Sequence, residues 1–133
     1  MKWVVWLSGI PKPKGSWNPI ISRSTGRVFL KAPTNTKIWL DHASHEIKRL
    51  WLGPLISDPV RVDLDFFLPK PKLLKRLFPV GRRDGDLDKQ MRSILDVMTG
   101  VVYVDDSQVV DSCLSKRYGD EPGVKITIST MGL

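Results

Sequence analysis

The pattern of apolar and polar positions predicts several short strands. Strict alternation in VRVDLDFFL, residues 60–68, predicts a half-buried strand with Arg61, Asp63 and Asp65 on its solvent face. IISRSTGRVFL predicts a hairpin that turns at residues 24–26. Four further runs predict strands: KWVVWL at the start, then VVYV, QVVDSCLSKR and VKITIS.

Apolar residues at helical spacing predict two helices. One covers residues 34–52, where Asn35 or Thr36 can cap it and Gly53-Pro54 ends it. The other starts near Asp88 and closes at Gly100. Their apolar stripes are Trp39, Ala43, Ile47 and Leu50 in the first, and Leu87, Met91, Ile94, Leu95 and Met98 in the second. The order of elements predicts one α+β domain over residues 1–133, with two main helices packed on a mixed sheet.

A long loop, residues 69–85, separates the alternating strand from the second helix. Loops of more than about 12–15 residues in a small domain are usually functional or disordered. Its basic residues precede any acidic one: Lys70, Lys72, Lys75, Arg76, Arg82 and Arg83. Such a run is often only a solvated face, but its position directly ahead of an aspartate cluster favours binding of an anion.

Composition narrows the class of partner. The 133 residues carry a formal net charge of +7, which makes a polyanion such as nucleic acid the first partner to consider. The single cysteine, Cys113, excludes an internal disulfide, fits a reducing cytoplasm, and is expected to be buried on a strand. No apolar run approaches the roughly 20 residues of a membrane span, and the opening apolar stretch is short for a signal peptide. We therefore expect a cytoplasmic protein that does not enter a membrane.

Aspartates cluster at the start of the second helix and again behind it. Asp84, Asp86 and Asp88 fall within five residues, and Asp105-Asp106 follow VVYV. A short turn at Gly100 is expected to bring that second pair back beside the helix start. Aspartates at such positions cap helices and form turns. Carboxylates from two elements near a basic surface also suit Mg²⁺, which takes hard oxygen ligands and activates water at phosphodiesters. Residue chemistry alone leaves both interpretations open.

Other sites are poorly supported by the sequence. His42 and His45 are three residues apart on the first helix, but DHASHE lacks the HExxH order and no cysteine cluster supports a zinc site. No phosphate-binding glycine loop and no pattern for nucleophilic catalysis occurs. Trp17 could brace its proline-rich loop or stack on a base.

One segment, DLDKQMRSILDVMTGVVYVDDSQVVD (86–111), resembles the signature region of RusA-type Holliday junction resolvases. That family has D-x-D-N-x-x-K on a helix, an L-D-A-L-like stretch, a glycine-containing turn and D-D-x-Q-V. Asp86 and Asp88 match the first motif, Asp96 matches the later helical aspartate, and residues 105–109 match the last motif. The rest of the chain resembles the family more loosely.

The resemblance implies a homodimeric, Mg²⁺-dependent endonuclease, with Mn²⁺ able to substitute, commonly of phage or prophage origin in a bacterial host. Such enzymes resolve four-way DNA junctions by paired symmetric nicks in recombination and repair. It implies Asp86, Asp88 and Asp106 as metal ligands and catalytic residues, together with Arg92. Two residues depart from the family: Lys89 replaces its asparagine and Arg92 its lysine. Arg92 can hold a phosphate but cannot titrate as a base near neutral pH.

We further expect DNA contacts from the basic residues around this segment, which are Lys12, Lys14, Lys70, Lys72, Lys75, Arg76, Arg82, Arg83 and Lys89. The alternative is a non-catalytic basic DNA-binding protein whose aspartates are structural. The two hypotheses differ in whether DNA is cut in a Mg²⁺-dependent way.

Overall fold

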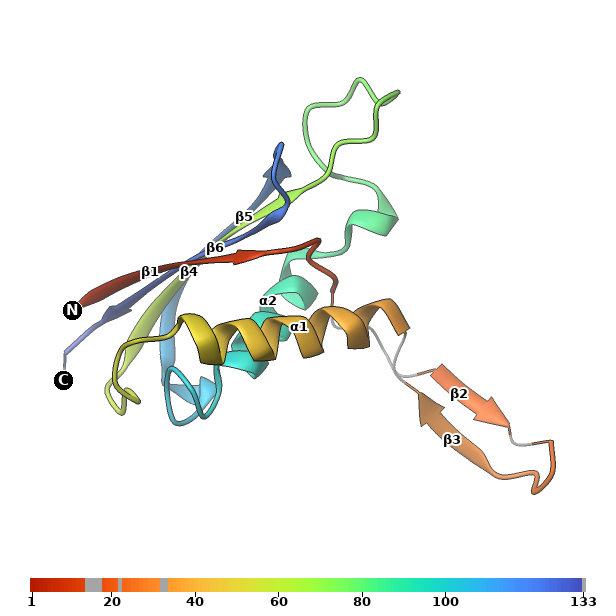
Figure 1. The fold of residues 1–133 in the computed structure, drawn as a ribbon, viewed down its shortest axis with the longest axis horizontal. Coiled ribbons are helices and arrows are strands. Elements are labelled where there is room, and N and C mark those ends of the chain that lie inside the picture. Colours follow the sequence, from red (N-terminus) through yellow and green to blue (C-terminus); the bar gives the residue numbers. More distant parts are fainter. Residues whose placement is uncertain (14–17, 22, 32–33, 133) are drawn as a thin grey trace.

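The computed structural model describes residues 1–13, 18–21, 23–31 and 34–132. In chain order its elements are β1 (Lys2–Ser8), β2 (Asn18–Ile21), β3 (Val28–Lys31), α1 (Thr34–Leu50), β4 (Val60–Leu68), the short 3-10 helix η1 (Arg82–Asp84), α2 (Leu87–Met98), a second 3-10 helix η2 (Asp106–Gln108), β5 (Val109–Tyr118) and β6 (Gly123–Thr130). Figure 1 shows α1 and α2 packed on one main sheet, which confirms the predicted α+β fold.

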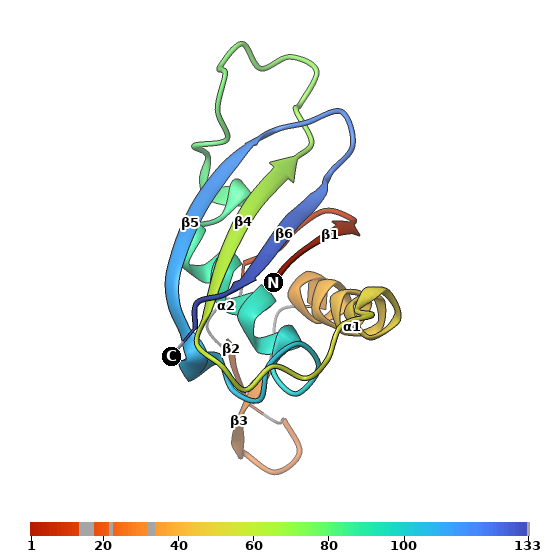
Figure 2. The same cartoon turned by 90° about the vertical axis from the view of Figure 1, so that its left-hand side faces the viewer.

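The main sheet has the strand order β1-β6-β4-β5. Strands β4 and β5 run parallel, whereas β6 pairs antiparallel with both β1 and β4, so the sheet is mixed as predicted. Figure 2 shows these strands side by side. Apolar residues alternate along β4, and Val62, Leu64 and Phe66 are fully buried. They form the core beneath both helices with Ile126 and Ile128 of β6.

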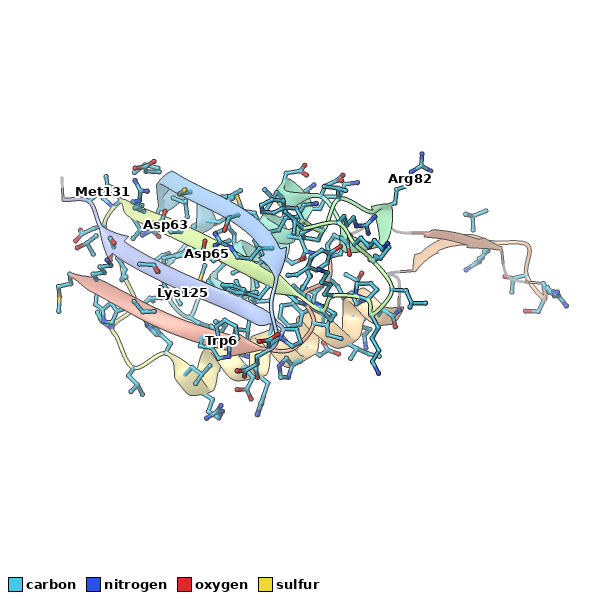
Figure 3. The ribbon with its side chains drawn as sticks, turned by 90° about the horizontal axis from the view of Figure 1, so that it is seen from above. Trp6, Asp63, Asp65, Arg82, Lys125 and Met131 are labelled. Atoms are coloured by element: carbon cyan, nitrogen blue, oxygen red, sulfur yellow. The ribbon has the colours of Figure 1, made fainter. Side chains whose placement is uncertain are left out.

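The opposite face of the sheet is polar and open. Figure 3 shows Trp6, Asp63, Asp65 and Lys125 spread over this face. Arg61 pairs with Asp63 at 3.0 Å and with Asp111 of β5 at 2.7 Å. The solvent-face interpretation of residues 61, 63 and 65 is therefore confirmed.

Each helix buries one face, and the details correct the predicted pattern. α1 buries Trp39, Ala43 and Ile47 as expected, but it begins at Thr34, so Asn35 and Thr36 lie inside its first turn and are not caps. On α2 the buried positions are Gln90, Ser93, Ile94 and Met98, whereas Leu87, Met91 and Leu95 are half-buried. No helix among the described residues is long and apolar enough to cross a membrane.

The predicted strand VVYV is wrong. Gly100 has φ +81°, and residues 99–104 form a turn that makes single bridges between Tyr103 and Ile56 and between Tyr103 and Thr99. The Tyr103 ring enters the core, where its hydroxyl donates to the Leu95 carbonyl oxygen at 2.8 Å. Val102 and Tyr103 are both buried and anchor this turn in the core. A half-exposed strand would bury only one of two consecutive side chains.

Strands β2 and β3 form the predicted hairpin, called the arm below, with its turn at residues 23–25, one residue before the predicted 24–26. The arm does not pair with the main sheet. In Figure 1 it projects from the body beyond the start of α1.

Candidate active site

The start of α2 lies at the end of the sheet where β4 and β5 finish. The chain leaves β4 at Leu68, passes through the basic loop and η1, and enters α2 with Asp86 as its N-cap. The buried side chain of Gln90 donates to the Asp84 carbonyl oxygen at 3.0 Å, and Arg76 pairs with the Asp84 carboxylate at 3.3 Å. These contacts fix η1 against α2 and make Asp84 a residue that organises the loop.

The two aspartates that follow are exposed and are not used to stabilise the helix. Asp86 occupies the N-cap position but accepts no backbone hydrogen bond with its side chain, which is 72% exposed. Its nearest cation is Lys89, with Nζ 3.7 Å from Oδ2. Among the described residues the Asp88 carboxylate has no ion-pair partner, and Arg92, one turn further along, is also exposed. A basic side chain thus lies beside one carboxylate, and the other remains open to solvent.

The second pair of aspartates divides into a cap and an exposed carboxylate. The Asp105 side chain accepts from the Ser107 backbone N–H at 3.0 Å, and Asp105 N–H donates to Gln108 Oε1 at 2.8 Å. Hydrogen bonding to Ser107, first from its side chain and then from its backbone N–H, holds the pKa of Asp105 below its ordinary value. Asp106 is exposed. Burial raises the pKa of the nearby Tyr103, and the negative charge of Asp106 raises it further. The capping interpretation therefore applies to Asp105 and leaves Asp106 available.

The three predicted metal ligands do not meet within one chain. Among the residues that the structure describes, no three histidine, cysteine, aspartate or glutamate side chains are grouped so as to hold one metal ion. Because β4 and β5 are parallel, α2 must carry the chain back to the opposite end of the sheet before β5 begins. The 12 residues of α2 span about 18 Å. Asp86 and Asp88 lie at one end of this helix, and Asp106 lies near the other end, beside Tyr103.

The expectation that Asp106 returns to the helix start is therefore wrong for a single chain. The strand that does return is β5, and it brings a different side chain. Lys116, near the end of β5, donates through Nζ to the Gly85 carbonyl oxygen at 2.8 Å, directly before Asp86. We did not predict this residue, because its place depends on the parallel pairing of β4 and β5. The only sequence feature that could have indicated this contact is a lysine near the end of the predicted strand.

The basic loop offers several exposed cations. Lys70, Lys72, Lys75 and Arg82 are exposed, and Figure 3 shows Arg82 pointing away from the body. Arg76 instead donates to the Tyr118 hydroxyl at 2.9 Å in addition to its pair with Asp84, so it ties the loop to β5. The side chain of Arg83 and all of Lys14 and Trp17 lie outside the described residues.

The segment of Lys12 also approaches this end of α2. Ser93 Oγ donates to the Lys12 carbonyl oxygen at 3.2 Å, and Thr36 Oγ1 donates to the Pro13 carbonyl oxygen at 3.2 Å. Both helices therefore hold the chain where it leaves the body for the arm. The Lys12 side chain is half-buried.

The remaining predicted features are structural. His42 Nε2 lies 2.7 Å from the Ser8 carbonyl oxygen, and since a carbonyl only accepts, this nitrogen carries the proton. The described residues form no metal group around His42 and His45. Cys113 is exposed on β5, which corrects the expectation of a buried cysteine. Its backbone N–H donates to the Asp63 carboxylate at 2.9 Å.

Comparisons with known proteins identify the family of the chain. The chain is 26% identical over 129 residues to the uncharacterized protein YqaN of Bacillus subtilis strain 168, covering 88% of this chain and 89% of the relative. A family model described as Endodeoxyribonuclease RusA matches residues 11–129, which include the basic loop, α2 and both aspartate pairs. The predicted resemblance is confirmed, and the protein belongs to the RusA family of endodeoxyribonucleases.

Proposed function

We propose that the protein is a Mg²⁺-dependent endonuclease that resolves four-way DNA junctions by paired symmetric nicks during recombination and repair. Family membership supports a nuclease that acts on such junctions. The observation that carries the metal-dependent chemistry is the start of α2. Asp86 occupies the N-cap position there, but its side chain makes no capping hydrogen bond. Asp86 and Asp88 are both exposed, and the basic loop directly precedes them in the chain.

The chemistry of these donors fits Mg²⁺. This ion is usually held by one or two carboxylates, with water and substrate phosphate oxygens as its other ligands. Asp86 and Asp88 would supply two carboxylates from positions two residues apart, and Asp106 would be a third. When bound, Mg²⁺ supplies an activated water and stabilises the negative charge that develops on the leaving oxygen.

A homodimer accounts for the distance between the carboxylates. In a two-fold dimer each contact occurs twice, with the roles of the two chains exchanged. If the α2 helices of two copies lie antiparallel, the Asp86–Asp88 end of one copy lies beside Asp106 of the other, and the reverse holds at the second site. Two such sites match two symmetric nicks.

The other residues act on the DNA itself. Arg92 is always protonated, so its role is to hold the scissile phosphate and stabilise its charge, and not to move a proton. Lys89 neutralises Asp86 in the free protein and becomes available to a phosphate when Asp86 binds a cation. Lys70, Lys72, Lys75 and Arg82 hold the DNA backbone without reading its sequence.

The test is incubation of the protein with a synthetic four-way junction, a fork and a linear duplex, with Mg²⁺, Mn²⁺ or EDTA. We expect two symmetric nicks in the junction with either cation, products that a ligase can seal, and no cleavage in EDTA. Binding of the junction without cleavage under all three conditions would instead support the non-catalytic alternative. Cleavage in EDTA would refute the metal-dependent chemistry and leave the nuclease assignment standing.

A further inference from the structure

The β2–β3 arm is built as an isolated element. Its four residue pairs run from Asn18–Lys31 to Ile21–Val28, and neither strand pairs with the main sheet. A lone two-stranded hairpin is marginally stable in water unless it packs against something else. Val28 in the arm is 63% exposed. The arm is therefore expected to be stabilised by contact with a partner.

The charge of the chain identifies the chemistry of that partner. Residues 1–40 contain no aspartate or glutamate, although they carry seven of the 21 basic residues. The remaining 93 residues carry fourteen charges of each sign, so the formal net charge of +7 lies entirely in the part of the chain that contains the arm. These seven residues are Lys2, Lys12, Lys14, Arg23, Arg27, Lys31 and Lys37. A chain segment with this excess of positive charge suits a polyanion and repels a second copy of itself.

Two arginines stand at the tip of the arm. Arg23 and Arg27 flank the turn, both are exposed, and neither forms an ion pair with a residue that the structure describes. The four-residue strands of the arm each span about 13 Å at the usual rise of a strand. A two-stranded ribbon of this kind fits the major groove of duplex DNA, which is about 12 Å wide.

The chain that leads into the arm is held near the candidate active site as far as Pro13. The hydrogen bonds from Ser93 and Thr36 to the main chain at Lys12 and Pro13 hold the entry to the arm against α2 and α1. Figure 3 shows Arg82 of the basic loop and the arm on the side of the body away from both termini, whereas Figures 1 and 2 show the basic loop and the arm projecting from the body in different directions. DNA held by the basic loop at the start of α2 would therefore meet the arm with a segment that lies further along the DNA.

We propose that the arm is a second DNA-binding element, which places Arg23 and Arg27 against the phosphates of a duplex arm beyond the segment held by the basic loop. The inference rests on the proposed function in taking branched DNA as the substrate. It assigns the arm to the phosphate backbone, so its contribution is independent of base sequence.

The test compares wild type with Arg23→Gln/Arg27→Gln in binding a synthetic four-way junction in EDTA over a series of NaCl concentrations. Each phosphate contact contributes about 0.9 to the slope of log affinity against log salt, so the loss of two contacts from each chain of the proposed homodimer should lower the slope by roughly 4. At about 0.1 M salt this corresponds to an affinity loss of between a thousandfold and ten-thousandfold. The matched control is Lys2→Gln/Lys48→Gln, which removes the same charge from exposed residues at the opposite end of the body. It should change the slope little.

Unchanged affinity and slope in the arginine variant would overturn the inference, and so would an equal loss in the control, which would indicate a general charge effect. Sedimentation of the variant tests whether the arm instead binds a second copy of this chain. Conversion of a dimer to a monomer would make the arm an interface between copies. Since binding is measured in EDTA, the result does not depend on catalysis. If the wild-type protein binds the junction through the arm but never nicks it, the proposed nuclease function is refuted and the inference about the arm still holds.

Discussion

Both α2 and η2 have an aspartate at the N-cap position, but the two aspartate side chains make different contacts. At η2, Asp105 is part of a complete capping box with Ser107 and Gln108. At α2, Asp86 is also the N-cap, yet its side chain accepts no backbone hydrogen bond and its nearest cation is Lys89 at 3.7 Å. An aspartate N-cap normally stabilises its helix. At α2 the capping hydrogen bond is absent and the carboxylate stays exposed, which is the arrangement that the proposed metal site requires.

The largest effect that this comparison predicts is on catalysis by Asp86→Asn. Removing one ligand charge should lower Mg²⁺-dependent nicking of a four-way junction by at least about a thousandfold, as expected for loss of a major electrostatic contribution to the transition state. The melting temperature should stay within about one degree, because no capping bond is lost. Gel assays of nicking and thermal unfolding measure both.

Asp41→Asn is the matched control for that variant, because it removes an exposed carboxylate that lies on α1 and forms a solvent-exposed ion pair with Lys37. It should leave nicking unchanged. Full activity in Asp86→Asn would remove Asp86 from the site, and a large drop in its melting temperature would make it a structural cap after all.

The next prediction tests whether the exposed carboxylates of α2 and η2 work together across a dimer. Asp86→Asn and Asp106→Asn proteins should each be inactive alone. Mixed and allowed to exchange subunits, half of the dimers contain one chain of each kind, and one of the two sites in each mixed dimer has all three aspartates. About a quarter of wild-type nicking should return, as single nicks. No recovery despite proven exchange would mean that the three carboxylates belong to one chain.

A smaller effect is expected at η2. Asp105→Ala removes the cap and should lower the melting temperature by a few degrees, while Asp105→Asn, which keeps an acceptor, should lower it less. Nicking well below the melting temperature should fall far less than in Asp86→Asn. Loss of nicking in Asp105→Ala without any change in melting temperature would show instead that Asp105 is a ligand.

The smallest effect is the pH dependence of that cap. The pKa of Asp105 is held below its ordinary value of 3.8 in the folded protein. The charged cap therefore contributes fully above the unfolded-state pKa, and this contribution is lost as the pH falls through the lower folded-state pKa. Differential thermal unfolding of wild type and Asp105→Asn should show a constant difference from pH 7 to about 5 that narrows below about 4. A difference that widens on acidification would contradict the assigned shift.

Local patterns predicted most of the fold correctly. Alternation along β4 identified its buried and exposed faces, and the turn predicted at residues 24–26 identified the arm to within one residue. The buried face of α2 was less well predicted, because Gln90 and Ser93 are buried for their hydrogen bonds to Asp84 and Lys12 and not for apolar packing. Propensity and period contain no information on such tertiary hydrogen bonds.

The arrangement of the site was beyond local patterns for a different reason. Whether Asp106 or Lys116 reaches the start of α2 depends on whether β5 pairs parallel or antiparallel with β4, and on which strand lies between β4 and β1. These pairings join residues about 50 positions apart, such as Ser112 and Val62. The side chains of β4 and β5 are compatible with parallel and with antiparallel pairing. Only the complete fold therefore determines which residue reaches the start of α2.

The position of β6 has a consequence for how this chain folds. β6 is the last strand in chain order, yet it lies between β1 and β4, and its Thr130 exchanges hydrogen bonds with Met1. Until β6 is synthesised, β1 and β4 have no partner in common, and each has an unpaired apolar edge. The sheet therefore cannot assemble progressively as the chain emerges during translation. A chain that stops before residue 123 is expected to aggregate, so premature termination yields insoluble protein rather than a partly active nuclease.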